Sequence, residues 1–285
     1  MNVVFSVIFP QNLTYLKSFI RSLENQVDKN FILVLVNDGV YELSKYFENS
    51  KMPIRIIEID GLKLTHFEIR LYGLNKIIEW GANKVVFADS DDEFSINRTL
   101  LTFKYLDSYP IVCNDLVTMN NDGVVINENY WDIRLGEIFE FSSSFIKDKN
   151  IIGFGNSGIN KDKLIEILQV LGNSKEGFDW LFFSSYKDDF KALFFSKAKT
   201  FYRQHDRNLL GANQLSVLSL KKKIELKITH YEKLLLLKKD LELLNALDKY
   251  RSILKKSNNF FEKKVKQINS SNTNYFWFEE TNLLL

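Results

Sequence analysis

Three carboxylates directly follow a buried apolar run in the first half of the chain. The run Val85-Val86-Phe87-Ala88 leads into Asp89-Ser90-Asp91-Asp92. Carboxylates this close repel one another unless they are protonated, solvated or neutralised, and a hard divalent cation with oxygen ligands neutralises them best. The cluster therefore indicates a cation site. The alternative is an acidic turn in which Asp89 or Ser90 caps a helix that begins near Ser95.

Apolar strands and amphipathic helices alternate over residues 1 to 115. Strands separated by helices of this length predict right-handed crossovers and a Rossmann-like, mostly parallel sheet flanked by helices, so the fold class is α/β. In such a sheet the strand ends carry the functional loops to one edge. The predicted strands are Val3 to Phe9, Phe31 to Val36, Ile54 to Ile59 and Lys84 to Ala88, and the predicted helices are Leu13 to Gln26 and Phe67 to Trp80.

Two other strand ends carry side chains that suit ligand binding. In Asn37-Asp38-Gly39 the glycine permits a tight turn, and Asp38 can accept a hydrogen bond from a ring N–H or a hydroxyl. The alternative is an ordinary turn aspartate. The first strand ends in Phe9-Pro10-Gln11-Asn12, a rigid turn in which Asn12 can cap the next helix, bind a ligand, or do both.

Composition places the chain among ordinary soluble proteins. It has 285 residues, 45% hydrophobic and 26% charged, which suits one or two domains. Cys113 is the single cysteine, so an internal disulfide framework and a cysteine-based zinc site are excluded and a reducing compartment is expected. The sequence shows no export signal and no apolar stretch of membrane-spanning length. We therefore expect a cytoplasmic protein.

The C-terminal part, residues 213–285, differs in charge from the rest. Residues 221–266 contain fourteen Lys or Arg and six Asp or Glu, whereas residues 1–220 contain 24 basic and 28 acidic side chains. Without glycine or proline after Gly211, Leu220 to Ile268 is expected to form long helix. One interpretation is a helical hairpin that packs on the rest of the chain or on a second copy. The other is peripheral attachment to an anionic membrane face.

Taken together, the order of these elements resembles the family 2 glycosyltransferases of the GT-A fold. The resemblance covers about residues 3 to 210. It rests on the following segments: Val7 to Asn12; Ser22 to Gln26 with Phe31 to Gly39; Ile69-Arg70-Leu71-Tyr72-Gly73-Leu74; Asp89-Ser90-Asp91-Asp92, similar to a D-x-D motif; Gly177-Phe178-Asp179-Trp180; and Tyr202-Arg203-Gln204-His205.

This resemblance implies a catalytic domain over residues 1–212, with a nucleotide-binding half (1–115) and an acceptor half (116–212), followed by a helical extension over residues 213–285. It implies a UDP-sugar donor and Mn2+ or Mg2+, which would stabilise the leaving diphosphate. The expected metal ligands are Asp91 and His205; for His205 the alternative is a surface or capping histidine. The expected nucleotide-sugar contacts are Pro10, Asn12, Asp38, Arg70, Asp89, Ser90 and Asp92, with Asp38 and Arg70 at the base.

An inverting transfer also needs a base that takes the proton of the acceptor hydroxyl. The matched residue is Asp179; Glu176 is the second candidate, and the alternative for Asp179 is a helix cap before Trp180. Residues 153–158 contain three glycines and are expected to form a flexible wall or lid beside the substrates. They are not a P-loop, because no Gly-Lys-Ser/Thr sequence follows them.

The sequence departs from the family pattern at Gln11, Leu71 and Val40, which puts base stacking and the donor identity in doubt. An inactive relative that acts as a scaffold or glycan-binding subunit therefore stays an alternative. Nucleotidyl transfer would need a glycine-rich, lysine-bearing loop after the first strand, and Pro10 to Leu13 has none. Nucleic-acid binding is disfavoured because the basic tail lacks a recognisable binding motif.

The expected function is an inverting, metal-dependent transfer of a sugar from a UDP-linked donor to a glycan or lipid-linked acceptor. A bacterial surface glycan is the expected product. The reaction would take place in the cytoplasm or at the inner face of the membrane.

Overall fold

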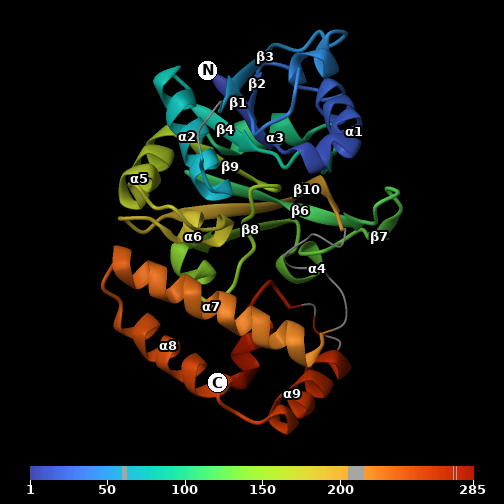
Figure 1. Ribbon diagram of the computed structural model, residues 1–285. Coiled ribbons are helices and arrows are strands. Elements are labelled where there is room, and N and C mark those ends of the chain that lie inside the picture. Colours follow the sequence, from blue (N-terminus) through green and yellow to red (C-terminus); the bar gives the residue numbers. More distant parts are fainter. Residues whose placement is uncertain (60–62, 205–214, 272, 274) are drawn as a thin grey trace.

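The computed structural model describes residues 1–59, 63–204, 215–271, 273 and 275–285. In these residues a ten-stranded sheet has the order β3-β2-β1-β4-β9-β6-β10-β5, with β7 paired to β6 and β8 to β10. Figure 1 shows helices on both sides of the sheet and the C-terminal helices as a further layer at one end. The strands are β1 Asn2–Ile8, β2 Ile32–Asn37, β3 Ile54–Glu58, β4 Lys84–Phe87, β5 Glu93–Phe94, β6 Ile111–Met119, β7 Val125–Asn127, β8 Ile138–Ser142, β9 Ser157–Asn160 and β10 Lys191–Arg203.

Among the described residues six helices cover the sheet, and the first two begin and end close to the boundaries predicted from the apolar periodicity. They are α1 Leu13–Glu24, α2 His66–Glu79, α3 Arg98–Tyr105, α4 Asp132–Leu135, α5 Lys161–Leu171 and α6 Asp179–Ser184. Thr65 fixes the start of α2 through a capping box with Glu68. Buried residues of α1 and α3 pack on one face of the sheet, and those of α2, α5 and α6 pack on the other.

The first four strands form the expected parallel part of the sheet. β1 pairs in parallel with β2 and β4, so that Ile8 lies opposite Asn37 and Phe5 opposite Phe87. β2 pairs in parallel with β3. Because the carboxyl ends of parallel strands meet at one edge, the loops after β1, β2 and β4 lie together. The α/β sheet predicted from the sequence is confirmed.

The second half of the sheet mixes directions. β9 lies between β4 and β6 and is antiparallel to both, while β10 runs parallel to β6. The segment 153–158, expected to form a flexible wall or lid, ends in regular structure, because Ser157 and Gly158 belong to β9. A Cβ on Gly158 would come within 2.5 Å of Thr102 Cγ2, so the glycine allows α3 to pack closely on the strand.

The C-terminal region contains separate helices instead of one long one. They are α7 Val217–Leu237, α8 Leu241–Leu254 and α9 Asn258–Ser270. Asp240 ends the continuity after α7, because its side chain accepts hydrogen bonds from the N–H groups of Glu242 and Leu243 and so starts a new helix. Ser257 does the same for α9 through the N–H of Phe260. Polar caps, without glycine or proline, therefore interrupt the helix predicted from the apolar pattern.

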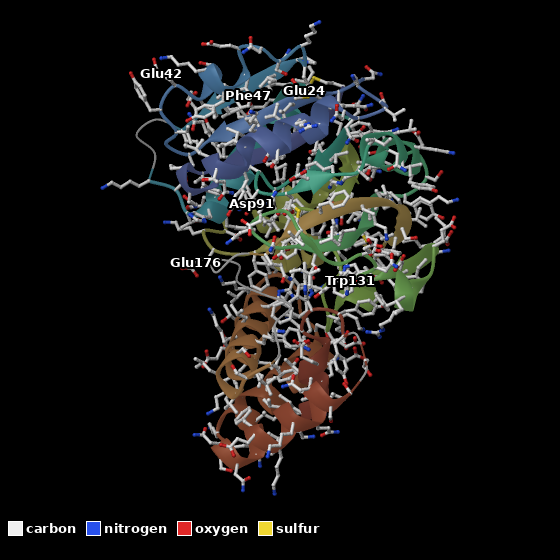
Figure 2. All side chains as sticks on the ribbon, turned by 90° about the vertical axis from the view of Figure 1, so that its right-hand side faces the viewer. Glu24, Glu42, Phe47, Asp91, Trp131 and Glu176 are labelled. Carbon is white, nitrogen blue, oxygen red and sulfur yellow. The ribbon has the colours of Figure 1, made fainter. Side chains whose placement is uncertain are left out.

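These helices pack on the α/β part through the same apolar core. Tyr231 of α7 and Trp180 of α6 are buried in one cluster, and α7 also contacts the short 3-10 helix Glu279–Leu284 near the C-terminus. Trp131 lies where the α/β part meets the C-terminal helices (Figure 2), and its ring is 5.1 Å from that of Phe276. In the part of the chain that the structure describes, no helix is both long and apolar enough to cross a membrane.

Candidate active site

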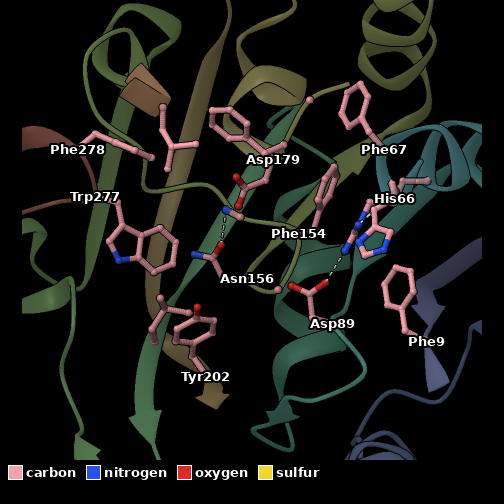
Figure 3. Close-up of a pocket in the computed structure, with 17 residues that line it drawn as sticks. Phe9, His66, Phe67, Asp89, Phe154, Asn156, Asp179, Tyr202, Trp277 and Phe278 are labelled. Carbon is pink, nitrogen blue, oxygen red and sulfur yellow. Dashed lines mark hydrogen bonds and ion pairs between the residues drawn. The ribbon is translucent and has the colours of Figure 1, made fainter. Parts of the chain in front are cut away.

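A pocket of about 340 Å³ opens at the carboxyl edge of the parallel strands. This volume is within the range of small-molecule sites. Arg70 and Asp89 face the pocket from the first half of the chain, Asn156 and Asp179 from the second, and Trp277 from the C-terminal end. Figure 3 shows Asp179 between Trp277 on one side and Phe154 on the other. The pocket therefore combines charged groups with aromatic walls.

Arg70 and Asp89 form the charged side of the pocket. Arg70 Nη2 lies 3.4 Å from Asp89 Oδ1, and Arg70 Cζ lies 5.9 and 5.2 Å from the ring centroids of Phe9 and Phe154. Burial raises the pKa of Asp89, the positive charge of Arg70 opposes this rise, and the negative charge of Asp91 adds to it. The Asp89 side chain remains 33% exposed, so it can still contact a ligand.

The acidic turn, residues Asp89 to Asp92, is hydrogen-bonded to the loop after β1. Asn12 Nδ2 donates to Ser90 Oγ at 3.1 Å, and Ser90 Oγ donates to the carbonyl of Val7 at 3.1 Å. Asn12 therefore holds the acidic turn and makes no side-chain cap to α1. Asp89 and Ser90 do not cap the next helix either, since α3 begins at Arg98 after Asn97.

The end of β10 holds the other half of the acidic turn. The backbone N–H of Arg203 donates to Asp92 Oδ1 at 2.9 Å, and Arg203 Nε donates to the carbonyl of Asp91 at 2.9 Å. Asp91 is thus placed beside the end of β10. His205 itself lies outside the described residues, so its predicted role is not addressed by the structure.

Arg98 is a buried cation beneath the acidic turn that the sequence analysis did not single out. Its guanidinium donates to the carbonyls of Phe87 at 2.6 Å and Gly155 at 2.8 Å, and to Asn114 Oδ1 at 2.9 Å. Burial lowers the pKa of Arg98 to about 9, against the opposing charges of Asp92 and Asp89. An arginine at a helix start has no sequence signal that separates this role from an ordinary surface position.

The burial and ionisation of Asp92 show whether a divalent cation would fit at the acidic turn. Asp92 is 1% exposed, and its Oδ2 has no hydrogen-bond partner among the described residues. Burial, together with the negative charges of Asp91 and Asp89, raises the pKa of Asp92 well above its ordinary value. A Cβ on Gly155 would lie 2.9 Å from Asp92 Oδ2 and 3.1 Å from Asp89 Oδ2, so the glycine leaves both oxygens room.

These oxygens suit Mn2+ or Mg2+, which take few protein carboxylates and complete their shell with phosphate and water. Within residues 1–59, 63–204, 215–271, 273 and 275–285, no three His, Cys, Asp or Glu side chains are grouped to hold a metal. A cation at this turn would therefore need further ligands from its substrate.

Asp179 stands at the first residue of α6. Its Oδ1 accepts from the N–H of Trp180 at 2.7 Å and from Asn150 Nδ2 at 3.4 Å. Burial raises the pKa of Asp179 to about 7; the hydrogen bond from Trp180 opposes the rise, and the negative charge of Asp89 adds to it. Asp179 thus bonds the first turn of α6 while it faces the pocket, which lets it exchange a proton near neutral pH.

Of the residues predicted from the sequence, Arg70, Asp89 and Asp179 line the pocket. Asp38 lies beside the loop after β1, since its N–H donates to the carbonyl of Ile8 at 3.0 Å. Glu176, the second base candidate, is directed to solvent with 76% of its side chain exposed and pairs with Lys233 at 3.1 Å. The remaining predicted residues of the described chain, outside the pocket lining, are Pro10, Asn12, Ser90, Asp91 and Asp92.

Several pocket residues were not predicted. His66 stacks on Phe9 with ring centroids 4.6 Å apart, and Tyr202 lies near Trp277 with centroids 5.8 Å apart. Phe278 completes the wall beside Trp277 (Figure 3). Only the aromatic character of residues 275–278 marked the C-terminal segment in the sequence, and that pattern carries no information about which surface it meets.

No protein-family model matches the sequence, and no curated protein matches it. Solved structures match its fold. S. aureus TarS 1–349 in complex with UDP-GlcNAc aligns with a TM-score of 0.57 at 14% identity, over 89% of this chain and 71% of that one. A second structure of S. aureus TarS aligns with a TM-score of 0.58 at 14% identity, over 94% of this chain and 47% of that one.

Two further solved structures have a similar fold. GalNAc-T7 with UDP, GalNAc and Mn2+ aligns with a TM-score of 0.55 at 13% identity, over 95% of this chain and 57% of that one. The mannosyltransferase PcManGT from Pyrobaculum calidifontis, with GDP-Man and Mn2+, aligns with a TM-score of 0.56 at 12% identity, over 99% and 78%. The fold is that of the GT-A glycosyltransferases.

Proposed function

We propose that this protein is a family 2 glycosyltransferase that moves a sugar from a nucleotide-diphosphate donor to an acceptor hydroxyl with inversion at the sugar carbon. The observation that carries the proposal is a pocket with Arg70 and Asp89 on one side and, on the other, Asp179, whose carboxyl has a pKa raised to about 7. The fold adds support, because neighbours of this fold were solved with UDP-GlcNAc, UDP or GDP-Man. A UDP-sugar is the donor we favour.

We assign the two substrates to different parts of the chain. Residues 1–115 would bind the nucleotide, with Asp38 and Arg70 at the base and Asp89, Ser90 and Asp92 around the ribose and diphosphate. Residues 116–212 would supply the acceptor half. Pro10 and Asn12 would hold the loop after β1 against the acidic turn, as the bond from Asn12 to Ser90 supports.

Asp91 and His205 are the residues that we propose to hold Mn2+ or Mg2+. A bound divalent cation would neutralise the charge that develops on the leaving diphosphate. Asp91 fits this role because Arg203 Nε holds its backbone carbonyl at the acidic turn. Asp92 Oδ2 has no hydrogen-bond partner among the described residues, and a cation at the same turn would favour its ionised form against the raised pKa.

Asp179 would act as the base. Its carboxylate takes the proton of the acceptor hydroxyl while that oxygen forms a bond to the anomeric carbon of the donor. The bond from that carbon to the diphosphate oxygen breaks, and the diphosphate leaves with the electron pair. The raised pKa keeps Asp179 basic enough to accept this proton and low enough to be ionised near pH 7.

The acceptor we propose is a hydroxyl of a bacterial surface glycan, free or lipid-linked, modified in the cytoplasm or at the inner membrane face. Fold likeness alone carries no substrate, so this assignment rests on the resemblance of the sequence motifs. The C-terminal helices, residues 213–285, would add a wall to the pocket in addition to any contact with membrane or a second copy.

A thermal-shift panel of UDP, GDP, CDP and ADP, each with and without Mn2+, tests the proposal. We expect one nucleoside diphosphate, UDP, to raise the melting temperature with Mn2+, because a ligand that binds only the folded state stabilises it. Asp91→Ala should abolish the shift. Asp248→Ala, at an exposed position on α8, is the matched control and should keep it. Indifference to every nucleotide would refute the transferase and favour the scaffold alternative.

A further inference from the structure

The C-terminal segment, residues 275–285, supplies one wall of the pocket although it lies about a hundred residues after Asp179. Trp277 and Phe278 face the cavity together with Tyr202 of β10 and Leu226 of α7. Figure 3 shows Trp277 and Tyr202 on the side opposite Phe9 and His66. None of these four wall side chains carries a charge. The wall therefore differs in chemistry from the side with Arg70 and Asp89.

Asn150 fixes this wall and the candidate base at once. Its backbone N–H donates to the carbonyl of Trp277 at 2.8 Å, and its side-chain Nδ2 lies 3.4 Å from Asp179 Oδ1. Trp277 Nε1 also donates to Tyr130 Oη at 3.3 Å, which sets the orientation of the indole. Trp277 is thus held in a fixed relation to the carboxylate that would take the acceptor proton.

Lys227 of α7 holds the other side of the segment. Its ammonium is completely buried and donates to the carbonyls of Asp148 at 2.7 Å and Phe278 at 3.3 Å. It also donates to Thr281 Oγ1 at 3.0 Å and Asn282 Oδ1 at 2.6 Å. Phe278 has a φ of 71°, which side-chain-bearing residues rarely adopt. A strained residue persists when its surroundings determine it, and such strain clusters at ligand sites.

The chemistry of the wall selects its ligand. A diphosphate is bound by positive charge, which Arg70 offers on the opposite side of the pocket and this wall does not. An indole and a phenol ring present apolar faces that pack against a ring with an apolar face. A pyranose ring has such a face together with hydroxyl groups around its edge. The position of Asp179 beside the wall would let it reach one of these hydroxyls.

We propose that the C-terminal segment forms the acceptor subsite, in which a sugar ring of the acceptor stacks on Trp277 and directs its hydroxyl toward Asp179. This inference rests on the proposed transferase function. Its consequence is that acceptor choice depends on residues outside the α/β part, at the end of the chain.

The test uses ligand-detected saturation-transfer NMR on the full chain with UDP and Mn2+ present. The probes are methyl glycosides of glucose, galactose, mannose and N-acetylglucosamine, with sorbitol as an acyclic control. We expect at least one glycoside, and not sorbitol, to bind. Trp277→Leu should weaken this binding about tenfold or more, because the stacking face is lost. Trp80→Leu, at a half-exposed position at the end of α2, is the matched control.

UDP with Mn2+ should stabilise the wild type and Trp277→Leu equally, because the wall does not hold the donor. A second readout needs no variant. Trp131 and Trp180 are fully buried and Trp80 lies outside the pocket lining, so a glycoside that stacks on Trp277 should shift the tryptophan emission of the wild type.

Three results would overturn the inference and leave the transferase intact. They are unchanged glycoside binding in Trp277→Leu, no glycoside binding by a protein that binds UDP, and loss of UDP stabilisation in Trp277→Leu. In the last case the wall would hold the donor. Absence of UDP binding by the wild type would instead refute the proposed function itself.

Discussion

Asp179 and Asp89 line one pocket from different halves of the chain, and the ionisation of one affects the other. Burial raises the pKa of Asp179 to about 7, and the negative charge of Asp89 contributes to that rise. Arg70 pairs with Asp89 at 3.4 Å, and its positive charge also opposes the rise in the pKa of Asp179. The pocket thus holds a carboxylate suited to a charged ligand and another suited to proton transfer.

Removal of the carboxylate at position 179 should abolish transfer and leave donor binding unchanged. Asp179→Asn keeps the size of the side chain and its hydrogen bond from Trp180 but cannot take a proton. We expect turnover to fall about 10²- to 10⁴-fold, the usual contribution of a general base. The measurement is UDP release from UDP-sugars with methyl glycosides as acceptors, with nucleotide binding followed in parallel. Equal turnover in variant and wild type would remove Asp179 from the mechanism.

The same group predicts an acid limb in the pH profile. Below a pKa of about 7 the carboxyl is protonated and cannot act as base, so kcat/KM should fall about tenfold per pH unit. The measurement is kcat/KM for the donor between pH 5 and 9. A profile that is flat through pH 6 would show that the reaction does not depend on this group.

Asp179 should also make stability depend on pH. Its pKa is about 7 in the folded state and 3.8 ordinarily, so between these values the folded protein retains a proton that the unfolded chain has lost. The free energy of unfolding therefore decreases as pH rises from about 4 to 7. In Asp179→Asn the free energy of unfolding should not decrease in this way. Between pH 4 and 7 it should therefore rise by about 2 kcal/mol relative to that of the wild type, a value reduced to allow for the contact of the side chain with solvent in the pocket. Urea unfolding at pH 4.5 and 7.5 measures the difference, and parallel pH dependences would contradict it.

Two glycines in one loop offer a matched pair of variants. In Gly155→Ala the new methyl would meet Asp92 Oδ2 at 2.9 Å and Asp89 Oδ2 at 3.1 Å. In Gly153→Ala it would meet Asp179 Oδ2 at 3.1 Å and Asn156 Oδ1 at 3.3 Å. Gly155→Ala should therefore weaken Mn2+-dependent UDP binding, whereas Gly153→Ala should retain that binding and lose transfer. Identical effects of both variants on UDP binding would show that the loop has no such division.

The buried ammonium of Lys227 predicts the opposite pH trend. Burial lowers its pKa to about 7 from 10.5, although the carboxylates of Asp148 and Glu280 oppose this shift. Between these values the unfolded chain holds a proton that the folded protein has released, so the free energy of unfolding increases with pH. From pH 6.5 to 9.5 the wild type should gain about 2 to 3 kcal/mol relative to Lys227→Met. Lys222→Met, at an exposed position on the same helix, should follow the wild type, and a wild type without this gain would contradict the prediction.

The parallel half of the sheet was predictable because buried strands and amphipathic helices leave local apolar patterns. β1 to β4 and the helices α1 and α2 appear close to the expected ranges. The same local pattern placed Asp89 just after the strand that is β4, whereas Arg70 and Asp179, which line the pocket with it, were named from the resemblance of the sequence motifs.

The rest depended on contacts between distant residues. Arg98 is buried because Phe87, Asn114 and Gly155 converge on it, and no local pattern shows that convergence. The aromatic wall at Trp277 likewise depends on Asn150, which lies more than a hundred residues earlier. The breaks in the C-terminal helix are made by the single polar caps Asp240 and Ser257, which a strong leucine periodicity conceals.

A crystal of the full chain grown with UDP and Mn2+ and measured at the manganese absorption edge tests the central claim most directly. The account predicts an anomalous peak at the acidic turn beside Asp91, with the diphosphate next to it and the sugar end directed into the pocket toward Asp179. A turn without metal, or UDP bound outside the pocket that Arg70, Asp89 and Asp179 share, would contradict it.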